Sequence, residues 1–458
     1  MFSIPSIRVA IVGAGPGGFF AAGELFKQLG DGVRVDVIDQ LPVPYGLVRY
    51  GVAPDHPRTR RVIRQFEAFA RAQNFSFLGN VAVGRDVTVE ELRSLYDAVI
   101  LATGAEKSRD PEIPGTQLPG FHHAIDMVRW YNGHPDYRDY AADFSCERAV
   151  VIGNGNVALD IARMLIRNPE ELRSTDIAKH ALEALAESRI REIHILGRRG
   201  PAQNRFTAPV LSELASLPGV SCVAHSDELV LNEESRREMQ DAHEIGRKRA
   251  LDVLQSFAMN GGEAGQKRVV FRFLLSPLDV TGPDRVTGVR CRRNRLEGEP
   301  RHQRAVPTPA RETLDCGMVV SCIGYRGEPV PGLPFDHARG VLPHRQGRVL
   351  QGSEVIKGVY ATGWIKQGGH GLIGHLKPDA VETVRSVMED LNASTGERKT
   401  RSSEVGDLSE ILLHRGKRVI SYAEWKTIDE AEIRRGVQSG KIRENYTSWE
   451  ELLSAAGA

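Results

Sequence analysis

A buried strand that leads directly into a glycine-rich turn and then into an apolar helix constrains the fold of this chain most. Residues 7–12 are almost entirely apolar, and residues 13–18 follow without a spacer as Gly-Ala-Gly-Pro-Gly-Gly. An alanine-rich helical segment extends from Phe19 to Leu29, and Val33 to Asp39 has the pattern of a second strand. This order predicts a β-α-β unit with parallel strands.

The glycine spacing in this turn is typical of dinucleotide-binding sites. A lone glycine-rich turn is weak support, because such turns also end helices and shape ordinary loops. In this context Gly13 permits the tight turn, Gly15 lets the backbone approach a pyrophosphate, and Gly18 allows close helix packing. The helix N-terminus offers N–H groups to the anion, and Asp39 stands where a ribose hydroxyl needs an acceptor. We therefore expect a first dinucleotide site here.

A second unit of the same kind begins in the middle of the chain. Residues 149–152 form an apolar strand, Gly153 to Ala158 form the turn with Gly155 at its centre, and a helical pattern continues to Ile166. Its next strand is expected at residues 192–196. Because Ala158 replaces the last glycine, this motif is weaker by itself than the first one.

Two arginines follow the second strand of this unit. An NAD site usually carries an acidic residue there, whereas this chain has Arg198 and Arg199. Two guanidinium groups bind an adenosine 2′-phosphate through charge-assisted, forked hydrogen bonds. The alternative is a solvated pair in an ordinary loop. The context favours NADPH over NADH at this second site.

The pattern of apolar strands predicts how the two units are joined. Strands near residues 96–101, 318–322 and 358–360 are each followed by small residues and a glycine. Such strands fit a chain that passes back and forth between two sheets. We expect an α/β fold with two Rossmann-like, three-layer domains, in which residues 107–330 are inserted into a discontinuous domain of residues 1–106 and 331–458. The charged or Gly/Ser-rich segments 234–268 and 395–407 are expected on the surface.

Composition excludes several other classes of protein. The 458 residues include 41% hydrophobic and 26% charged residues, and no apolar run is long enough for a membrane span. The net charge of +1 gives no overall attraction to nucleic acid. The first strand begins so close to Met1 that we expect no leader peptide and a cytoplasmic location.

The cysteines give no sign of a metal or dithiol centre. Five cysteines are scattered through the chain without a C-x-x-C pair. This spacing argues against a zinc ribbon, an iron-sulfur cluster or a redox dithiol held by the chain itself. Electron chemistry would therefore come from a bound organic cofactor.

Four long motifs resemble one family of flavoproteins. They are residues 42–57, residues 155–163, the Gly-Arg-Arg-Gly-Pro run at 197–201 with Phe206-Thr207, and Ala-Thr-Gly-Trp-Ile-Lys at 361–366. Together with Trp425-x-x-Ile-Asp and Gly440-Lys-x-Arg-Glu in the tail, they closely resemble the adrenodoxin reductase-like ferredoxin-NADP reductases. The resemblance covers nearly the whole chain.

The resemblance implies two cofactors, a reaction and particular contacts. NADPH would give hydride to FAD, and the flavin would pass single electrons to an iron-sulfur ferredoxin. His56 and Glu213 match positions near the reacting rings, where they would orient a ring or relay protons; from the residues alone, His56 reads as a turn residue. The remaining implied contacts are Ala14, Asp39, Leu47, Val83, Trp364, Gly371, Leu372 and Ile373 on FAD, and Asn156, Val157, Arg198 and Arg199 on NADPH.

Some residues depart from the family pattern. Residues 367–370, Gln-Gly-Gly-His, stand where Arg-Gly-Pro-Thr is usual, and His375-Leu376 replaces Thr-Asn. Val210 replaces the first of two glutamates, so that only Glu213 remains. FAD binding should survive these changes. They leave open a different acceptor, such as a quinone, a small organic substrate or oxygen, or a role as the electron-input subunit of a larger complex.

A cluster of arginines lies close in sequence to the expected flavin loop. Acidic ferredoxins dock on basic patches by electrostatic attraction, and an ordinary solvated helix face is the alternative. The expected docking residues are Arg49, Arg58, Arg60 and Arg61, with Arg64 beside them.

Overall fold

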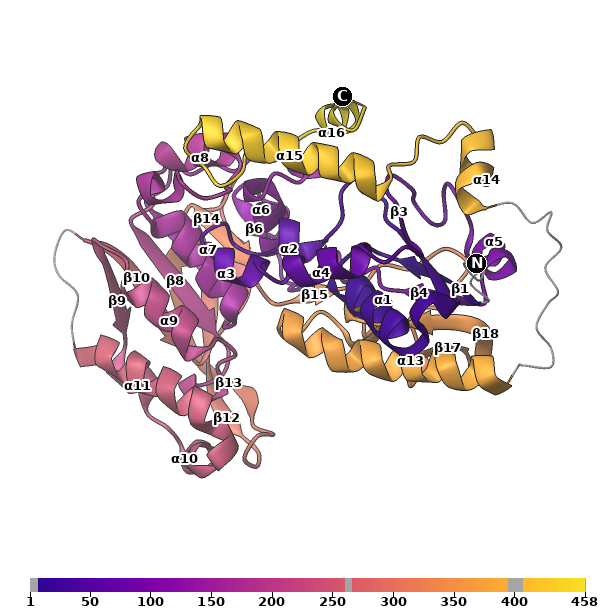
Figure 1. The fold of residues 1–458 in the computed structure, drawn as a ribbon. Helices are drawn as coiled ribbons and strands as arrows, with labels where there is room; N and C mark the ends of the chain where they lie inside the picture. Colours follow the sequence, from indigo (N-terminus) through magenta and orange to yellow (C-terminus); the bar gives the residue numbers. More distant parts are fainter. Residues whose placement is uncertain (1–6, 260–265, 394–406, 458) are drawn as a thin grey trace. The chain divides into compact units, whose positions relative to one another are not determined.

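The computed structural model describes residues 7–259, 266–393 and 407–457 (Figure 1). The chain divides into two compact units. The first comprises Met1–Lys107, Asn132–Asp136 and Gly324–Ala458, and the second comprises Ser108–Tyr131 and Tyr137–Ile323. Each unit is built on its own parallel sheet, which confirms the predicted α/β fold with two dinucleotide-binding domains.

The first unit contains a seven-stranded sheet. Its order is β16-β17-β18-β4-β1-β2-β3, and the strands from β18 to β3 are parallel. Alternate residues of β1 enter two different cores, because successive side chains of a strand point to opposite faces. The strands are β1 (Ile7–Val12), β2 (Val33–Ile38), β3 (Phe75–Leu78), β4 (Ala98–Leu101), β16 (His344–Arg345), β17 (Arg348–Gln351) and β18 (Glu354–Ala361).

Helix α1 (Pro16–Leu29) is the central helix of this unit. Its first ten residues are all buried, and it packs against α13 (Leu376–Ala393) and α4 (Ile63–Ala70). Phe19 of α1 stacks on Phe66 of α4 with ring centroids 4.9 Å apart. The other helices of the unit are α2 (Leu47–Tyr50), α3 (Pro57–Arg60), α5 (Val89–Leu95), α12 (Trp364–Gln367), α14 (Leu408–His414), α15 (Tyr422–Gln438) and α16 (Trp449–Ala455).

The second unit has three layers. A six-stranded parallel sheet, in the order β6-β14-β7-β8-β10-β9, is covered by helices on one face and by an antiparallel sheet, β11-β12-β13, on the other. Figure 1 shows α9 and α11 side by side in the helical layer. The strands are β6 (Phe121–His123), β7 (Arg148–Ile152), β8 (Glu192–Gly197), β9 (Val220–Ala224), β10 (Lys267–Phe273), β11 (Leu275–Thr281), β12 (Gly288–Glu297), β13 (Arg304–Asp315) and β14 (Met318–Ser321).

Helices occupy much of segment 234–268, for which surface loops or exposed helices are expected from the sequence. The helices of the second unit are α6 (Ala124–Tyr131), α7 (Asn156–Ile166), α8 (Lys179–Ala186), α9 (Ala208–Ala215), α10 (Glu233–Gln240) and α11 (Ile245–Met259). Helix α10 begins one residue before this segment, and α11 lies within it and buries Leu251, Leu254 and Phe257. Residues 395–406 of the other expected surface segment lie outside the described residues.

A buried ion-pair network ties the C-terminal helices to the first unit. The Glu432 carboxylate on α15 accepts hydrogen bonds from Arg49 at 2.6 Å, from Arg443 at 2.7 Å and from the Tyr446 N–H at 2.9 Å. Burial, the largest single influence, would lower the pKa of Arg49, but the charge of Glu432, the neighbouring Tyr50 and the hydrogen bonds to both together raise it. Glu432 is fully buried, so its loss would leave two charges poorly compensated.

We expect Glu432→Ala to destabilise the first unit by about 3–5 kcal/mol, because it leaves a buried guanidinium without its partner. The thermal unfolding midpoint of the FAD-loaded protein should fall by roughly 10 °C. Glu430→Ala is the matched control on the same helix, since Glu430 forms only an exposed pair with Arg434 at 3.9 Å. Equal midpoints for the two variants would contradict the assignment.

Candidate functional site

The first glycine turn joins β1 to α1, and glycine is required at its positions for different physical reasons. Gly13 has φ +111°, and a side chain there would place Cβ 2.4 Å from the Ala102 carbonyl oxygen. A Cβ at Gly18 would lie 2.1 Å from the Gly13 carbonyl oxygen. These two glycines are therefore required by the packing of the protein itself.

The packing of the protein does not by itself explain why residue 15 is a glycine. Gly15 is the N-cap of α1 with φ −83°, which any residue adopts, and a Cβ built on it meets no atom within 4 Å. The open space therefore lies directly beside a helix N-terminus, where unpaired N–H groups bind anions. This cradle fits the pyrophosphate of a dinucleotide.

Asp39 follows β2 and is held against the same turn. Its carboxylate accepts the Ala14 N–H at 2.7 Å and the Leu41 N–H at 2.9 Å. Burial raises the pKa of Asp39 to about 7, although these two hydrogen bonds act in the opposite direction. Each carboxylate oxygen keeps a second lone pair, so the group remains able to accept a ribose hydroxyl.

A second segment of the first unit packs onto this turn. The Tyr45 N–H donates to the Ala14 carbonyl at 2.8 Å, and a Cβ on Gly46 would lie 3.0 Å from the Gly15 Cα. Gly46 has φ +47° and is the N-cap of α2, so it sets Leu47 at the start of that helix. Leu47 is half-buried, as is Val83, which forms a bridge to Val87.

A third segment reaches the turn from the end of β18. Gly363 has φ +73°, and its Cα lies 3.4 Å from the position of a Cβ on Gly17. The next residue, Trp364, has a buried Nε1 without a hydrogen-bond partner among the described residues. An orphaned donor at this place fits a ligand that supplies an acceptor.

The group that holds this third segment was not predicted from the sequence. Asp379 on α13 accepts the Gly363 N–H at 2.6 Å and the Thr362 hydroxyl at 3.0 Å, and it pairs with Lys366 at 2.7 Å. It lies 16 residues beyond Gly363 in the chain. No motif marks such a contact, and only the fold brings the two elements together.

The loop that departs from the family pattern is open to solvent. Gly371 and Leu372 are exposed and Ile373 is half-buried, and the Leu372 N–H donates to His375 Nδ1 at 3.3 Å. Gly368 and Gly371 both have positive φ, at +91° and +88°. His370 is exposed in the same loop.

The second glycine turn repeats the geometry of the first within the second unit. Gly153 has φ +139°, and a Cβ there would lie 2.4 Å from the Cys322 carbonyl oxygen. Gly155 is the N-cap of α7, and a Cβ on it would meet only the Arg205 Cβ, at 3.9 Å. Asn156 accepts the Thr207 N–H at 2.9 Å through its Oδ1, and Val157 is half-buried. A second cradle therefore opens at a second helix N-terminus.

Arg198 and Arg199 follow β8, as the sequence predicted. Arg198 is exposed and Arg199 is half-buried, while their carbonyl groups accept hydrogen bonds from Asn294 at 2.9 Å and Leu274 at 3.1 Å. In the part of the chain that the structure describes, neither guanidinium has an acidic partner. This donor set fits the 2′-phosphate of NADPH.

His56 and Glu213 belong to different units. His56 precedes α3, is half-buried, and donates its backbone N–H to the Ala53 carbonyl at 2.9 Å. Glu213 is exposed on α9. Their assignment near the reacting rings stays a prediction.

The expectation that Arg49 contributes to an exposed docking surface was wrong. Its side chain is only 5% exposed, because it pairs with Glu432 and lies over the Trp425 ring at 5.2 Å. Arg60 is half-buried and donates to the Val52 carbonyl and to Asn132. The exposed members of the cluster are Arg58, Arg61 and Arg64.

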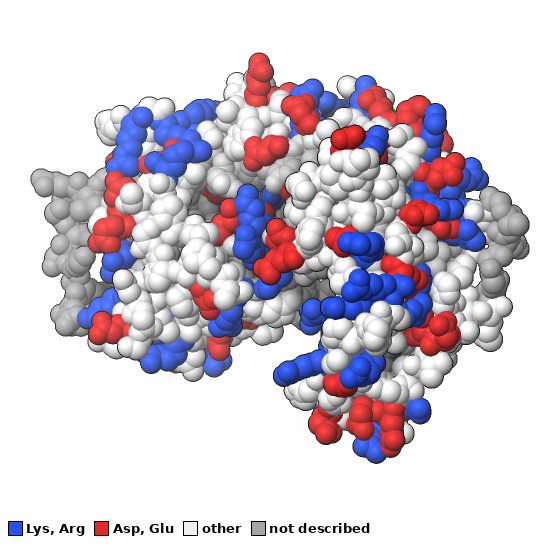
Figure 2. Space-filling view, turned by 180° about the vertical axis from the view of Figure 1, so that it is seen from behind, with Lys and Arg blue, Asp and Glu red and all other residues white. Residues whose placement is uncertain are grey.

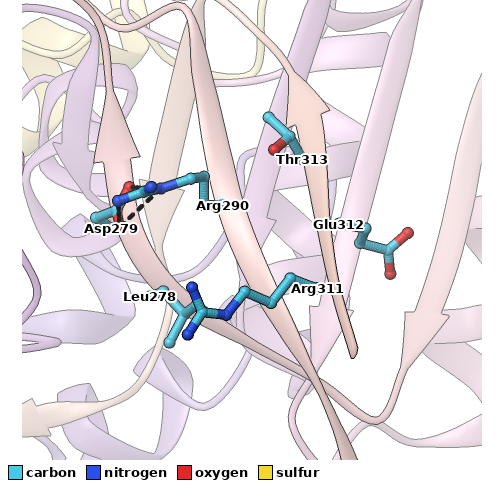
Figure 3. A pocket seen from close by; sticks show the side chains of 6 residues that line it. All are labelled: Leu278, Asp279, Arg290, Arg311, Glu312 and Thr313. Atoms are coloured by element: carbon cyan, nitrogen blue, oxygen red, sulfur yellow. Dashed lines mark hydrogen bonds and ion pairs between the residues drawn. The ribbon is translucent and has the colours of Figure 1, made fainter. Parts of the chain in front are cut away.

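A cavity of about 490 Å³ lies on the β11-β12-β13 sheet of the second unit, and no residue of either glycine turn lines it (Figure 3). Its Arg290 already has a partner, Asp279, at 2.5 Å, so its charge is compensated. The cavity therefore does not compete with the turns as a cofactor site.

Figure 2 shows basic and acidic side chains interspersed over one face of the molecule, without one large area of a single sign.

Neither a membrane-spanning helix nor a metal-ligand cluster is found among the described residues. None of their helices is both long and apolar enough to cross a membrane. They also bring no three His, Cys, Asp or Glu side chains together as metal ligands.

Known proteins resemble the chain along its whole length. The pyridine nucleotide-disulphide oxidoreductase family matches residues 7–202. The mitochondrial NADPH:adrenodoxin oxidoreductase of Salvelinus fontinalis is 42% identical, over 99% of this chain and 92% of its own. NADPH-ferredoxin reductase FprA of Mycobacterium leprae is 41% identical over 97% of both chains.

A solved structure has the same fold. Mycobacterium tuberculosis FprA in complex with NADPH superimposes with a TM-score of 0.92 at 41% identity. The match covers 99% of this chain and 100% of that one. The chain therefore belongs to the family of the NADPH:adrenodoxin oxidoreductases and NADPH-ferredoxin reductases.

Proposed function

We propose that this protein is an NADPH:ferredoxin oxidoreductase that uses FAD. The observation that carries the proposal is the pair of glycine N-caps, Gly15 and Gly155, whose missing side chains leave open space at two helix N-termini. One cradle lies beside the carboxylate of Asp39 and the other belongs to the unit with Arg198 and Arg199. When bound, FAD supplies the chemistry that converts a two-electron hydride into single electrons.

The two units divide the work of binding. Residues 1–106 and 331–458 are proposed as the FAD domain, and residues 107–330 as the NADPH domain. Support for the first assignment comes from the three segments that meet at the turn of Gly15, which include Asp39 and Trp364. Support for the second comes from the uncompensated arginines after β8.

The chain's own residues bind and orient the cofactors. Hydride transfer needs alignment of the two rings and exclusion of water, and these follow from binding. His56 and Glu213 are proposed to orient a ring or relay a proton. Flavin contacts are proposed for Ala14, Leu47, Val83 and residues 371–373, and NADPH contacts for Asn156 and Val157.

A different acceptor is the second candidate function. In the loop of residues 367–371, Gln367, Gly369 and His370 stand where the family usually has Arg, Pro and Thr, and His370 is exposed. Glycine in place of proline at position 369 removes a restraint on the backbone of the loop. A small acceptor such as a quinone or oxygen would then reach the flavin without a docked protein.

Two further expectations stay proposals. A role as the electron-input subunit of a larger complex has no particular contact in the described residues to support it. The cytoplasmic location is also untested, and one of the relatives named above is a mitochondrial protein.

The Gly15→Ala variant should fold but lose most of its FAD. A methyl group fits sterically in the protein, yet it occupies the space beside the helix N-terminus and should weaken FAD binding about tenfold or more. The measurement is the flavin content and FAD dissociation constant of the purified protein. Gly32→Ala is the matched control, because a Cβ at Gly32 also meets no atom within 4 Å. Full FAD binding by Gly15→Ala would contradict the cradle.

NADPH should bleach the bound flavin of the unaltered protein in a stopped-flow experiment. The double variant Arg198→Ala/Arg199→Ala should raise the apparent KM for NADPH far more than the apparent KM for NADH. Each lost charge-assisted hydrogen bond should weaken binding of the 2′-phosphate about tenfold. Equal effects on both nucleotides would refute the 2′-phosphate role. Absence of bleaching in the unaltered protein would refute the proposed function.

Reduction of an acidic ferredoxin should slow steeply as salt is raised, because docking by opposite charges is screened. Arg58→Glu/Arg61→Glu should lower the rate at low salt and flatten its salt dependence. Lys357→Glu/Arg385→Glu makes the same change of charge at other exposed positions of the first unit and should leave the rate unchanged. Fast flavin reduction with no ferredoxin turnover would favour the different acceptor.

A further inference from the structure

The segment between β8 and α9 presents one arginine whose surroundings differ from those of a solvated loop. Residues 204–206 alternate in burial, since Asn204 and Phe206 are buried at 0% and 3% exposure and Arg205 is exposed. Burial of both neighbours fixes the direction in which the backbone presents Arg205. The arginine therefore has little freedom at its Cα, although its side chain reaches solvent.

The backbone of this segment is bonded to the second glycine turn. The Arg205 N–H donates to the Asn154 carbonyl at 2.8 Å, and Arg205 forms a β-bridge with Gly155. Two residues later, the Thr207 N–H donates to Asn156 Oδ1 at 2.9 Å. Arg205 is consequently fixed beside the N-terminus of α7.

Arg205 and the open space at Gly155 lie on the same side of this bridge. A Cβ built on Gly155 would be 3.9 Å from the Cβ of Arg205. That space is where the structure leaves room for a nucleotide. The Arg205 side chain therefore starts at the edge of the proposed NADPH site.

The charge of Arg205 also reaches the arginine pair after β8. Partial burial lowers the pKa of Arg199, and the positive charge of Arg205 lowers it further. The effect of Arg205 exceeds that of the neighbouring Arg198. The geometry agrees, because Arg205 is bonded to Asn154, and a Cβ on Gly197, the residue before Arg198, would lie 2.9 Å from the side-chain nitrogen of Asn154.

The side chains of Arg198, Arg199 and Arg205 form no ion pair in the described residues. Arg247, which also acts on Arg199, has its own partners in Glu238 and Glu244. The charge of Glu238 acts on Arg199 less than the charges of Arg205, Arg198 and Arg247 do. A cluster of guanidinium groups that repel one another is stabilised when an anion binds among them.

We propose that Arg205 is a third guanidinium of the 2′-phosphate site and raises the selectivity of this protein for NADPH over NADH. The proposal rests on the NADPH site proposed above and assigns a further residue to it. Arginine suits this role because its planar fork donates two hydrogen bonds to one phosphate.

A contact with the pyrophosphate is the competing role, because Arg205 is also close to Gly155. The two roles predict different ligand dependence. NADP⁺ and NAD⁺ share the pyrophosphate and differ only in the 2′-phosphate. A residue that binds the 2′-phosphate affects NADP⁺ alone, whereas one that binds the pyrophosphate affects both.

The test is calorimetric binding of NADP⁺ and NAD⁺ to the FAD-loaded Arg205→Ala variant. We expect NADP⁺ to bind about tenfold more weakly, as for the loss of one charge-assisted hydrogen bond, with NAD⁺ changed less than twofold. Equal loss for both dinucleotides would assign Arg205 to the pyrophosphate and overturn the proposal. Unchanged binding of both would show that Arg205 is an ordinary solvated residue and would also overturn it.

Two control variants make the result specific. Arg205→Lys should keep part of the affinity for NADP⁺, since lysine retains the charge and loses the fork. Arg173→Ala removes an exposed arginine of the same unit that pairs with Glu170, and it should change neither affinity. Loss of NADP⁺ affinity in Arg173→Ala would point to overall charge and contradict a local contact.

Binding measurements on combined variants distinguish this proposal from the proposed function. Arg198→Ala/Arg199→Ala should retain a residual preference for NADP⁺, and adding Arg205→Ala should remove it. These binding constants need no turnover. If the unaltered protein binds NADP⁺ but NADPH fails to bleach the flavin, the proposed function fails while the role of Arg205 is still measured.

Discussion

The structure depends on two strand-to-helix turns in which a glycine N-cap leaves open space beside the main-chain N–H groups of a helix N-terminus. An equivalent pair of glycines produces this arrangement in each unit. Gly13 and Gly153 have positive φ and lie against a carbonyl oxygen of a neighbouring segment, where a Cβ would come within 2.4 Å. Gly15 and Gly155 have ordinary φ and open surroundings. The first pair is required by the protein, and the second is explained by a ligand. This difference identifies the binding side of each turn without any bound molecule.

Residues from distant parts of the chain complete the site around the first turn. The β-α-β unit brings the helix N-terminus and Asp39 together, but the residues that close over them come from distant parts of the chain. Gly46 packs on Gly15, and Gly363 packs on Gly17. Asp379 then holds the Gly363 backbone in its left-handed conformation. Because the domain is discontinuous, the site is completed only when the C-terminal part of the chain returns to the sheet. Ligand binding and folding of this unit are therefore coupled.

A feature could be predicted from the sequence when its interacting residues lie close together along the chain. The two glycine turns, Asp39 and the arginine pair after β8 were predicted because strand, turn and helix are consecutive, and local periodicity reports them. The burial of Arg49 was not predicted, because its partner Glu432 lies 383 residues away in the chain. Asp379 and Arg205 were also missed, although their partners are closer. Neither belongs to a motif, and a contact between a loop and a turn leaves no periodic pattern.

Charge compensation separates arginines that stabilise the fold from those available to ligands. Arg49 and Arg272 are buried and paired with buried glutamates, so each would leave a buried carboxylate with less compensation if it moved. Arg198, Arg199 and Arg205 form no ion pair in the described residues, and the charges of Arg205 and Arg198 add to the effect of burial in lowering the pKa of Arg199. The net charge of +1 conceals this difference, because nearly equal numbers of basic and acidic residues are distributed unequally among sites. Guanidinium groups without ion-pair partners favour a ligand with more negative charge, and the 2′-phosphate is the part of NADPH that provides it. The proposed selectivity for the phosphorylated nucleotide therefore rests on the lack of carboxylate partners for these arginines in the described residues.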